Sequence, residues 1–340
     1  MRDVAIAAVV AVVLYSSGLL VILTPLSLLY IWVIHGRRLG FLTVAMALAA
    51  VAALYANFLP QAGVHAQGGG IAIPLPGMAM ADFVSSAFLS MAGIGYFLFY
   101  AVVALTIGEG VRRQWNLTRW CGTALLAGLA VFALVVAAAL LKVGGGIGSG
   151  FRNYLGSMIG EVLKMNQTAG KNGADLGFIA DHVDEIVSFM VGVAPALIFV
   201  FALVAVVVNI LLGRRLIHGR HAFAHVHNVA RFRLPDYAIW GVIGCGLAFF
   251  ADHYAIRTGW LEMAAVNCMI GVGALYFFQG LAVVVYFLQG VRLPLIKMIA
   301  YGAIIFFFQT IGMVIVAIGV ADVWVDFRLR SWKAKHGHQA

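Results

Sequence analysis

Residues 188–212, SFMVGVAPALIFVFALVAVVVNILL, carry no charged side chain over their whole length. A helix needs about 20 apolar residues to cross the hydrocarbon core of a bilayer, so this stretch predicts a membrane-spanning helix. A β-barrel would instead show alternating segments of about 10 residues, whereas this run is longer and apolar on all sides. Comparable runs fill most of the remaining chain, at residues 4–34, 41–58, 83–107, 121–141, 237–250, 263–288 and 295–320.

These runs predict an all-α, polytopic transmembrane bundle of about eight spans, with roughly seven to nine compatible with their lengths. Hydrophobic residues make up 63% of the 340-residue chain and charged residues only 10%, which excludes a water-soluble domain. We expect one transmembrane helical domain over residues 1–327 and a basic tail over residues 328–340. The three cysteines lie in or at the start of apolar runs without CxxC spacing, which predicts buried thiols and no disulfide framework.

Two of the apolar runs are interrupted. Ser16-Ser17-Gly18 and Thr24-Pro25 divide the run 4–34, which predicts either one long kinked helix or two short helices. The run 295–320 precedes a basic tail, and one further crossing would place that tail outside the cell. Either this run breaks near Gln309 into a hairpin or the tail is external.

The longest connection, residues 143–187, has two apolar stripes. The apolar residues between Phe151 and Leu163 recur at the spacing of one helix face, and so do those between Leu176 and Met190. Asp181, Asp184 and other acidic residues occupy the opposite face of the second stripe. We therefore expect two amphipathic helices in an extracytoplasmic connection, lying at the membrane surface or folded over the bundle.

The net charge of +9 resides mainly in short loops, which sets the expected orientation. The loops holding Arg37, Arg112 and residues 214–235 belong on the cytoplasmic side of a bacterial inner membrane. The lipid bilayer is the expected partner, with anionic lipid or a cytoplasmic or membrane protein at residues 214–233. The loop charge is explained without nucleic acid, and oligomerisation stays open.

Residues His218, His221 and His225 would share one face of a helix. Histidines so spaced can bind zinc, but no HExxH motif, nearby carboxylate or cysteine pair accompanies them, and the loop 214–233 holds five arginines that repel a divalent cation. We expect solvated histidines, no metal site and no cofactor. No nucleophile, acid–base pair or intramembrane carboxylate pair is apparent either, so the chain is not expected to be an enzyme.

Amide side chains at membrane depth are the remaining candidates, because each is costly there unless it is paired. They either hydrogen-bond neighbouring helices or line a substrate cavity, and the candidate ligand-binding set is Asn209, Asn267, Gln279 and Gln309. A second group near the end of the chain suggests a local ion pair and an interfacial anchor for the last helix. This structural motif comprises Asp322, Asp326 and Arg328, with Pro235 before an earlier span.

The order of several motifs between residues 190 and 330 resembles the YybS-like family of bacterial integral membrane proteins. They are Pro195, Asn209, Phe232 with Leu234-Pro235, Asn267, Gln279-Gly280-Leu281, Gly319, Asp322 and Asp326-Phe327-Arg328. That family is distantly similar to the S components of energy-coupling factor transporters. The resemblance implies a helical bundle that captures a small molecule on its outer side, as a binding or transport subunit. The alternative is a non-transporting scaffold or regulator of envelope processes that works through a partner protein.

Overall fold

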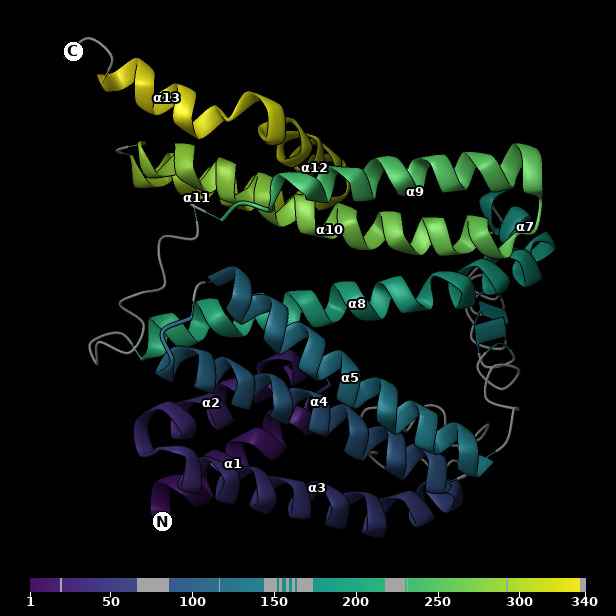
Figure 1. Cartoon of the computed structure of the whole chain (residues 1–340). Coiled ribbons are helices and arrows are strands. Elements are labelled where there is room, and N and C mark those ends of the chain that lie inside the picture. Colours follow the sequence, from purple (N-terminus) through teal and green to yellow (C-terminus); the bar gives the residue numbers. More distant parts are fainter. Residues whose placement is uncertain are drawn as a thin grey trace. The chain divides into compact units, whose positions relative to one another are not determined.

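The computed structural model describes residues 1–18, 20–65, 86–115, 117–143, 174–217, 230, 232–291 and 293–336, and also residues 152, 155, 156, 159, 160 and 163. Within these ranges the regular elements are all helices and no strand occurs (Figure 1), which confirms the predicted all-α class. The chain packs as two compact units. Unit 1 comprises Met1–Gly192 and Phe201–His225, and unit 2 comprises Val193–Val200 and Val226–Ala340. The single domain expected over residues 1–327 stays a prediction.

Six helices in the described part of the chain are long and apolar enough to cross a membrane: Arg37–Asn57, Gly93–Arg112, Arg119–Ala138, Val183–Leu216, Asp236–Ile256 and Trp260–Gln289. A seventh span results if the bent pair Pro294–Ile304 and Gln309–Val325 counts as one. The chain is therefore a multi-pass membrane protein in contact with lipid. The expected number of about eight was higher because residues 4–34 form helices too short to cross alone.

Unit 1 begins with two short helices. Helix α1 (Arg2–Ser16) ends before the 3₁₀ turn η1 (Val21–Leu23), and α2 (Thr24–His35) follows at once. Of the two alternatives for this run, the structure has the pair of short helices. Gly18 adopts a positive φ of 68°, a conformation that glycine tolerates best, and so lets the chain turn there.

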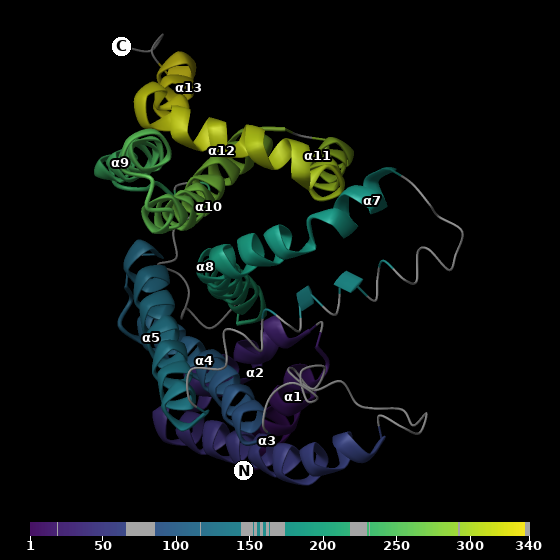
Figure 2. The ribbon, with the colours of Figure 1, turned by 90° about the vertical axis from the view of Figure 1, so that its right-hand side faces the viewer.

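Three longer helices complete the core of unit 1 (Figures 1 and 2): α3 (Arg37–His65), α4 (Ser86–Arg112) and α5 (Leu117–Val143). Helix α4 packs against α2, α3 and α5, and α1 packs against α2 and α3. Buried tyrosines join them: the Tyr15 hydroxyl donates to the Gly93 carbonyl at 2.6 Å and lies 3.2 Å from the Tyr55 hydroxyl.

The basic loops at the start of α3 and the end of α4 lie at the same end of unit 1. Glu109 accepts hydrogen bonds from both Arg37 and Arg113. At the same end, His35 at the end of α2 lies 3.4 Å from Asp3 in the first turn of α1. This arrangement agrees with placing both loops on one side of the membrane.

The connection before α8 differs from its predicted boundaries. The first amphipathic stripe lies largely outside the described residues, although Leu155 and Leu163 within it are buried, as an apolar face requires. The second is divided between the short helix α7 (Ala174–Asp181) and the first turns of α8, and the break lies at His182, whose Nδ1 contacts the Phe178 carbonyl. Helix α8 (Val183–Leu216) then starts earlier than expected, with Asp184 in its first turn, where a carboxylate favours the helix dipole.

Unit 2 is built on a helical hairpin. Helix α9 (Ile239–Ala251) runs antiparallel beside α10 (Trp260–Gln289), and the two are seen along their length in Figure 1 and nearly end-on in Figure 2. The short turn η4 (Asp236–Ala238) precedes α9, and the π-turn η5 (Asp252–Ile256) follows it. The buried Asp252 accepts hydrogen bonds from the backbone N–H groups of Thr258, Gly259 and Glu262, which caps the start of α10.

The last apolar run is broken close to Gln309, where one of the two alternatives placed a hairpin; the side of the membrane on which the tail lies stays a prediction. Helices α11 (Pro294–Phe306) and α12 (Phe308–Val325) meet at Phe307 with a bend of 104°. Helix α12 packs against α10, and a glycine from each helix makes this close approach possible. A β-carbon at Gly280 would collide with the Ile315 carbonyl, and one at Gly319 with the Tyr276 carbonyl. The chain continues as α13 (Phe327–His336) within the predicted basic tail.

Replacing Gly319 with alanine should therefore destabilise unit 2. We expect Gly319→Ala to lower the free energy of unfolding by about 1–3 kcal/mol, as overpacking does, measured by thermal unfolding in detergent. Gly312→Ala in the same helix is the control, because a β-carbon there meets nothing within 4 Å. That variant should be unchanged or slightly more stable, since alanine is the better helix former. Equal losses in both variants would contradict the close contact.

Candidate functional site

The break between α1 and α2 is the first place in the chain where backbone polar groups leave regular helical bonding at membrane depth. Helix α2 has 12 residues from the break to the end of the helix at His35. At a rise of about 1.5 Å per residue it is about 18 Å long, so the break lies well inside an apolar layer about 30 Å thick. Ser17 satisfies two backbone groups at the break: its hydroxyl donates to the Leu14 carbonyl and accepts from the Leu20 N–H.

Asn209 of α8 reaches into this break. Its Nδ2 donates to the Ile22 carbonyl of η1 and to the Ala205 carbonyl of its own helix, both at 2.7 Å. Both partners are acceptors, so the amide orientation is fixed with nitrogen toward them and oxygen away. The side chain is 0% exposed, and among the described residues its Oδ1 has no hydrogen-bond partner.

Two hydroxyl groups, one on each side of the break, also lack a hydrogen-bond partner among the described residues. Ser16 is the last residue of α1 and Thr24 the first of α2. The oxygens of both are buried and find no partner within the described ranges. Buried polar atoms are nearly always hydrogen-bonded, so several orphaned oxygens around one helix break suggest a ligand or water. We call Ser16, Thr24 and Asn209 the break site.

Asn267 is another amide of the candidate ligand-binding set, and its hydrogen bonds are made within the protein. Pro195 lies inside α8, where it lacks an N–H and crowds the preceding turn. From α10, Asn267 accepts a hydrogen bond from the Ala196 N–H at 2.9 Å and donates to the Met263 carbonyl at 2.8 Å. Asn267 thus bonds the α8 backbone next to the proline, which is an interhelical role.

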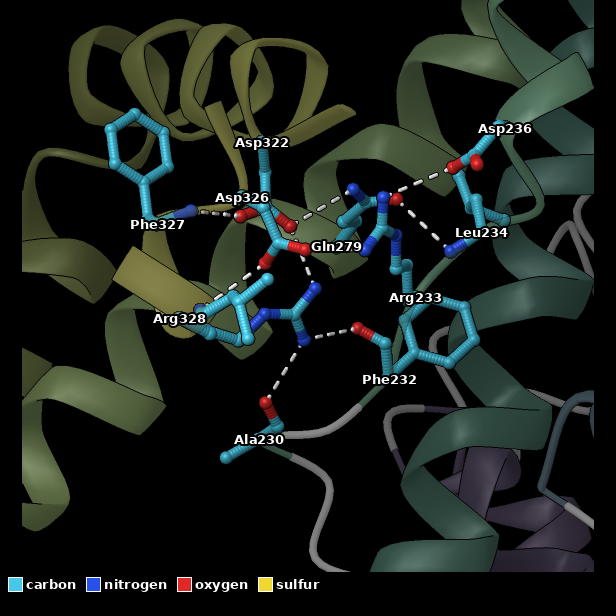
Figure 3. A network of polar contacts seen from close by, with 11 residues as sticks. Ala230, Phe232, Arg233, Leu234, Asp236, Gln279, Asp322, Asp326, Phe327 and Arg328 are labelled. Carbon is cyan, nitrogen blue, oxygen red and sulfur yellow. Dashed lines mark hydrogen bonds and ion pairs between the residues drawn. The ribbon is translucent and has the colours of Figure 1, made fainter. Parts of the chain in front are cut away.

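The second polar cluster lies in unit 2 and centres on Asp322 of α12 (Figure 3). This carboxylate is 0% exposed, and its contacts are drawn in Figure 3. It accepts from Arg328 Nη2 at 2.6 Å, from Gln279 Nε2 at 3.2 Å and from the Phe327 N–H at 3.1 Å. Both oxygens therefore accept hydrogen bonds, and the opposite charge of Arg328 makes burial of the carboxylate tolerable.

Arg328 and Gln279 extend this network to the extended segment that precedes α9. Arg328 Nη1 donates to the carbonyls of Ala230 and Phe232, at 3.1 and 2.8 Å. Gln279 Oε1 accepts from the Leu234 N–H at 3.0 Å. A chain segment without helical hydrogen bonds is thus paired by side chains of α10 and α13, as buried backbone groups require.

An outer pair of charges completes the cluster. Arg233 donates to Asp326 at 2.8 Å and to Asp236 at 3.1 Å. Burial opposes the guanidinium charge, but the two carboxylates outweigh it and raise the pKa of Arg233. Asp326 also ends α12 in a left-handed conformation, with φ of 45°, which turns the chain into α13. We call Arg233, Gln279, Asp322, Asp326 and Arg328 the C-terminal network.

The structure therefore separates the predicted site residues. Gln279 joins Asp322, Asp326 and Arg328 in the C-terminal network, next to Pro235, which starts the η4 turn. Gln309 is exposed near the α11–α12 bend. The histidines at 218, 221 and 225, and most of the basic loop, lie outside the described residues. Elsewhere in the described ranges, no three histidine, cysteine, aspartate or glutamate side chains gather as metal ligands.

Sequence reasoning missed the break site and Arg233. The interruptions at Ser16 and Thr24 were visible, but nothing in the sequence placed Asn209 against them, 187 positions from Ile22. Arg233 was assigned to a basic loop, whereas it pairs with two carboxylates. Only the three-residue spacing to Asp236 offered a signal for one of them.

Removing Asp322 should cost much more stability than removing an exposed carboxylate of the same cluster. We expect Asp322→Ala to lower the free energy of unfolding by about 3–5 kcal/mol, because Arg328 is left as an unpaired, largely buried charge. Asp236→Ala should cost about 0–1 kcal/mol, since this side chain is 75% exposed.

The double variant Asp322→Ala/Arg328→Ala should lose less than the sum of the two single variants, as groups in direct contact do. Thermal unfolding in detergent measures all four proteins. Additive losses would show that the two side chains do not interact.

Comparison with known proteins matches most of the chain to one family. The family model described as "Predicted membrane protein (DUF2232)" covers residues 75–323. This range contains Asn209, Asn267, Gln279 and Asp322, and it ends before Asp326 and Arg328. Comparisons with curated proteins and with solved structures found no match. The chain belongs to the DUF2232 family of predicted membrane proteins.

Proposed function

We propose that this protein binds a small polar solute at the break site and serves as a binding or transport subunit of a bacterial inner membrane. The observation that carries the proposal is the orphaned Asn209 Oδ1, held in place by two hydrogen bonds from its own amide nitrogen. A buried amide so fixed, with one oxygen unused, is costly in a membrane unless another group completes it.

The chemistry of the break site defines the solute. Asn209 Oδ1 can only accept a hydrogen bond, whereas the hydroxyls of Ser16 and Thr24 can donate or accept. None of the three carries a charge. The site therefore suits a small neutral molecule with at least one donor, or a compact monovalent cation. Broken helices at membrane depth build such sites in many transporters, because unwound backbone tolerates burial where it faces a cavity.

The resemblance to the YybS-like family, and through it to transporter S components, supports solute capture over catalysis. The same resemblance includes Asn209, which lies inside the matched family range. On this reading the C-terminal network is structural, since the polar groups of Asp322 and Gln279 are engaged within the protein. No observation favours the scaffold alternative in particular.

Thr24→Val provides a sharp test, because valine keeps the shape of threonine and removes a hydroxyl with no protein partner. The unliganded variant should unfold at the same or a higher temperature than the wild type, since an unsatisfied buried group is lost. The assay is thermal unfolding in detergent with a panel of amides, polyols, amino acids, sodium and ammonium. A solute at 100 times its Kd should stabilise the wild type by about 2.7 kcal/mol. Thr24→Val should lose most of that gain.

Thr310→Val serves as the matched control, because Thr310 is exposed and belongs to unit 2. It should keep the full stabilisation by the same solute. A solute that stabilises the wild type and Thr24→Val equally would place binding elsewhere. A wild-type protein that no member of the panel stabilises would count against the binding function itself.

A further inference from the structure

Two of the three cysteines meet between α9 and α10. Cys268 of one helix lies close enough to Cys245 of the other for the two thiols to interact. Cys245 belongs to α9 and is buried, at 7% exposure, as predicted. Cys268 belongs to α10 and is exposed, so the predicted burial is wrong for this cysteine. The pair lies in unit 2, and none of the break-site or C-terminal network contacts involves it.

The packing of the hairpin gives independent support for this pairing. A β-carbon on Gly241 would lie 3.5 Å from Val272 Cγ2, so these two positions face each other across the antiparallel helices. Cys245 lies one turn after Gly241, and Cys268 lies one turn before Val272. In antiparallel helices, such equal steps in opposite directions keep two residues at the same level and on facing sides.

The surroundings decide which reagents can reach the pair. Cys245 lies near the middle of the apolar helix Asp236–Ile256, so both thiols lie at membrane depth. Because Cys268 is exposed on this helix pair, its sulfur is open to molecules dissolved in lipid. Water-soluble thiols and disulfides would have to leave water to react there, whereas apolar oxidants concentrate in the bilayer.

We propose that Cys245 and Cys268 are a redox site that forms a reversible disulfide within the membrane, with a lipid-soluble quinone as the oxidant. The two S–H bonds break and one S–S bond forms. The two electrons and two protons released reduce the quinone to its hydroquinone, so the reaction balances without a further reactant. The disulfide fastens α9 to α10 at mid-span, beyond the Asp252 cap that already closes the turn between them.

The test uses the full-length protein in membranes, with Cys121→Ser as the background so that only the pair remains. Membranes are treated with a short-chain ubiquinone analogue, and free thiols are then counted by mobility shift with a polyethylene glycol maleimide after denaturation. We expect both thiols to be lost together without formation of dimers, and to return fully on treatment with dithiothreitol. Cys268→Ser in the same background should keep its one remaining thiol.

Two variants without the native pair separate geometry from chemistry. Gly241→Cys/Val272→Cys, with all native cysteines replaced by serine, should also form a disulfide with copper phenanthroline. Ala264→Cys with Cys268→Ser moves the second thiol one turn along α10, and it should not form a disulfide with Cys245.

Several results would overturn the proposal. The native pair could stay reduced while the Gly241→Cys/Val272→Cys pair is oxidised, which would show that the two native sulfurs do not meet. Oxidation of the native pair by copper phenanthroline but not by the ubiquinone analogue would remove the quinone as oxidant. Failure of both pairs would contradict the register of the hairpin. These outcomes are independent of solute binding at the break site, which lies in unit 1.

Discussion

Hydrocarbon offers no hydrogen-bond partner, so every polar group that this chain takes into the bilayer must be answered from within the protein. Within the helices the backbone bonds to itself, and at breaks and ends the described structure uses single side chains that bond to backbone groups. Asn267 meets the Ala196 N–H beside a proline, Asp252 caps the first turn of α10, and Arg328 collects two carbonyls of the segment before α9. Each of these side chains supplies hydrogen bonds to backbone groups of another part of the chain.

Against this background the two units differ in a way that bears on function. In unit 2 each polar atom of the buried Asp322 and Gln279 side chains is hydrogen-bonded, and the charges of Asp322 and Arg328 offset each other. In unit 1 the break between α1 and α2 leaves oxygens of Ser16, Thr24 and Asn209 without partners among the described residues. A polar cluster whose atoms are hydrogen-bonded within the protein favours rigidity. A cluster with unused hydrogen-bonding atoms can select a solute that supplies the missing partners.

The sequence predicted the helices well, because crossing the bilayer fixes a minimum apolar length. The runs that became α9 and α10 were placed within a few residues of their observed ends. The sequence could not predict which helix faces meet, since helices that are apolar all round carry no stripe to reveal their partners. Asn209 was therefore recognised as costly, but its position beside Ile22 was not. Asp322 and Arg328 were expected as a local anchor, and their link to Gln279 and Phe232 depends on packing between distant segments.

The bond between Ala196 and Asn267 has a consequence for biosynthesis. The acceptor is 71 positions later in the chain than the donor, so it leaves the ribosome well after α8 has entered the membrane. During that interval the Ala196 amide must do without the Asn267 oxygen, in the region that Pro195 already weakens. Insertion of the α9–α10 hairpin then supplies this interhelical bond. Translational pausing between these segments would prolong the period in which α8 lacks the bond beside Pro195.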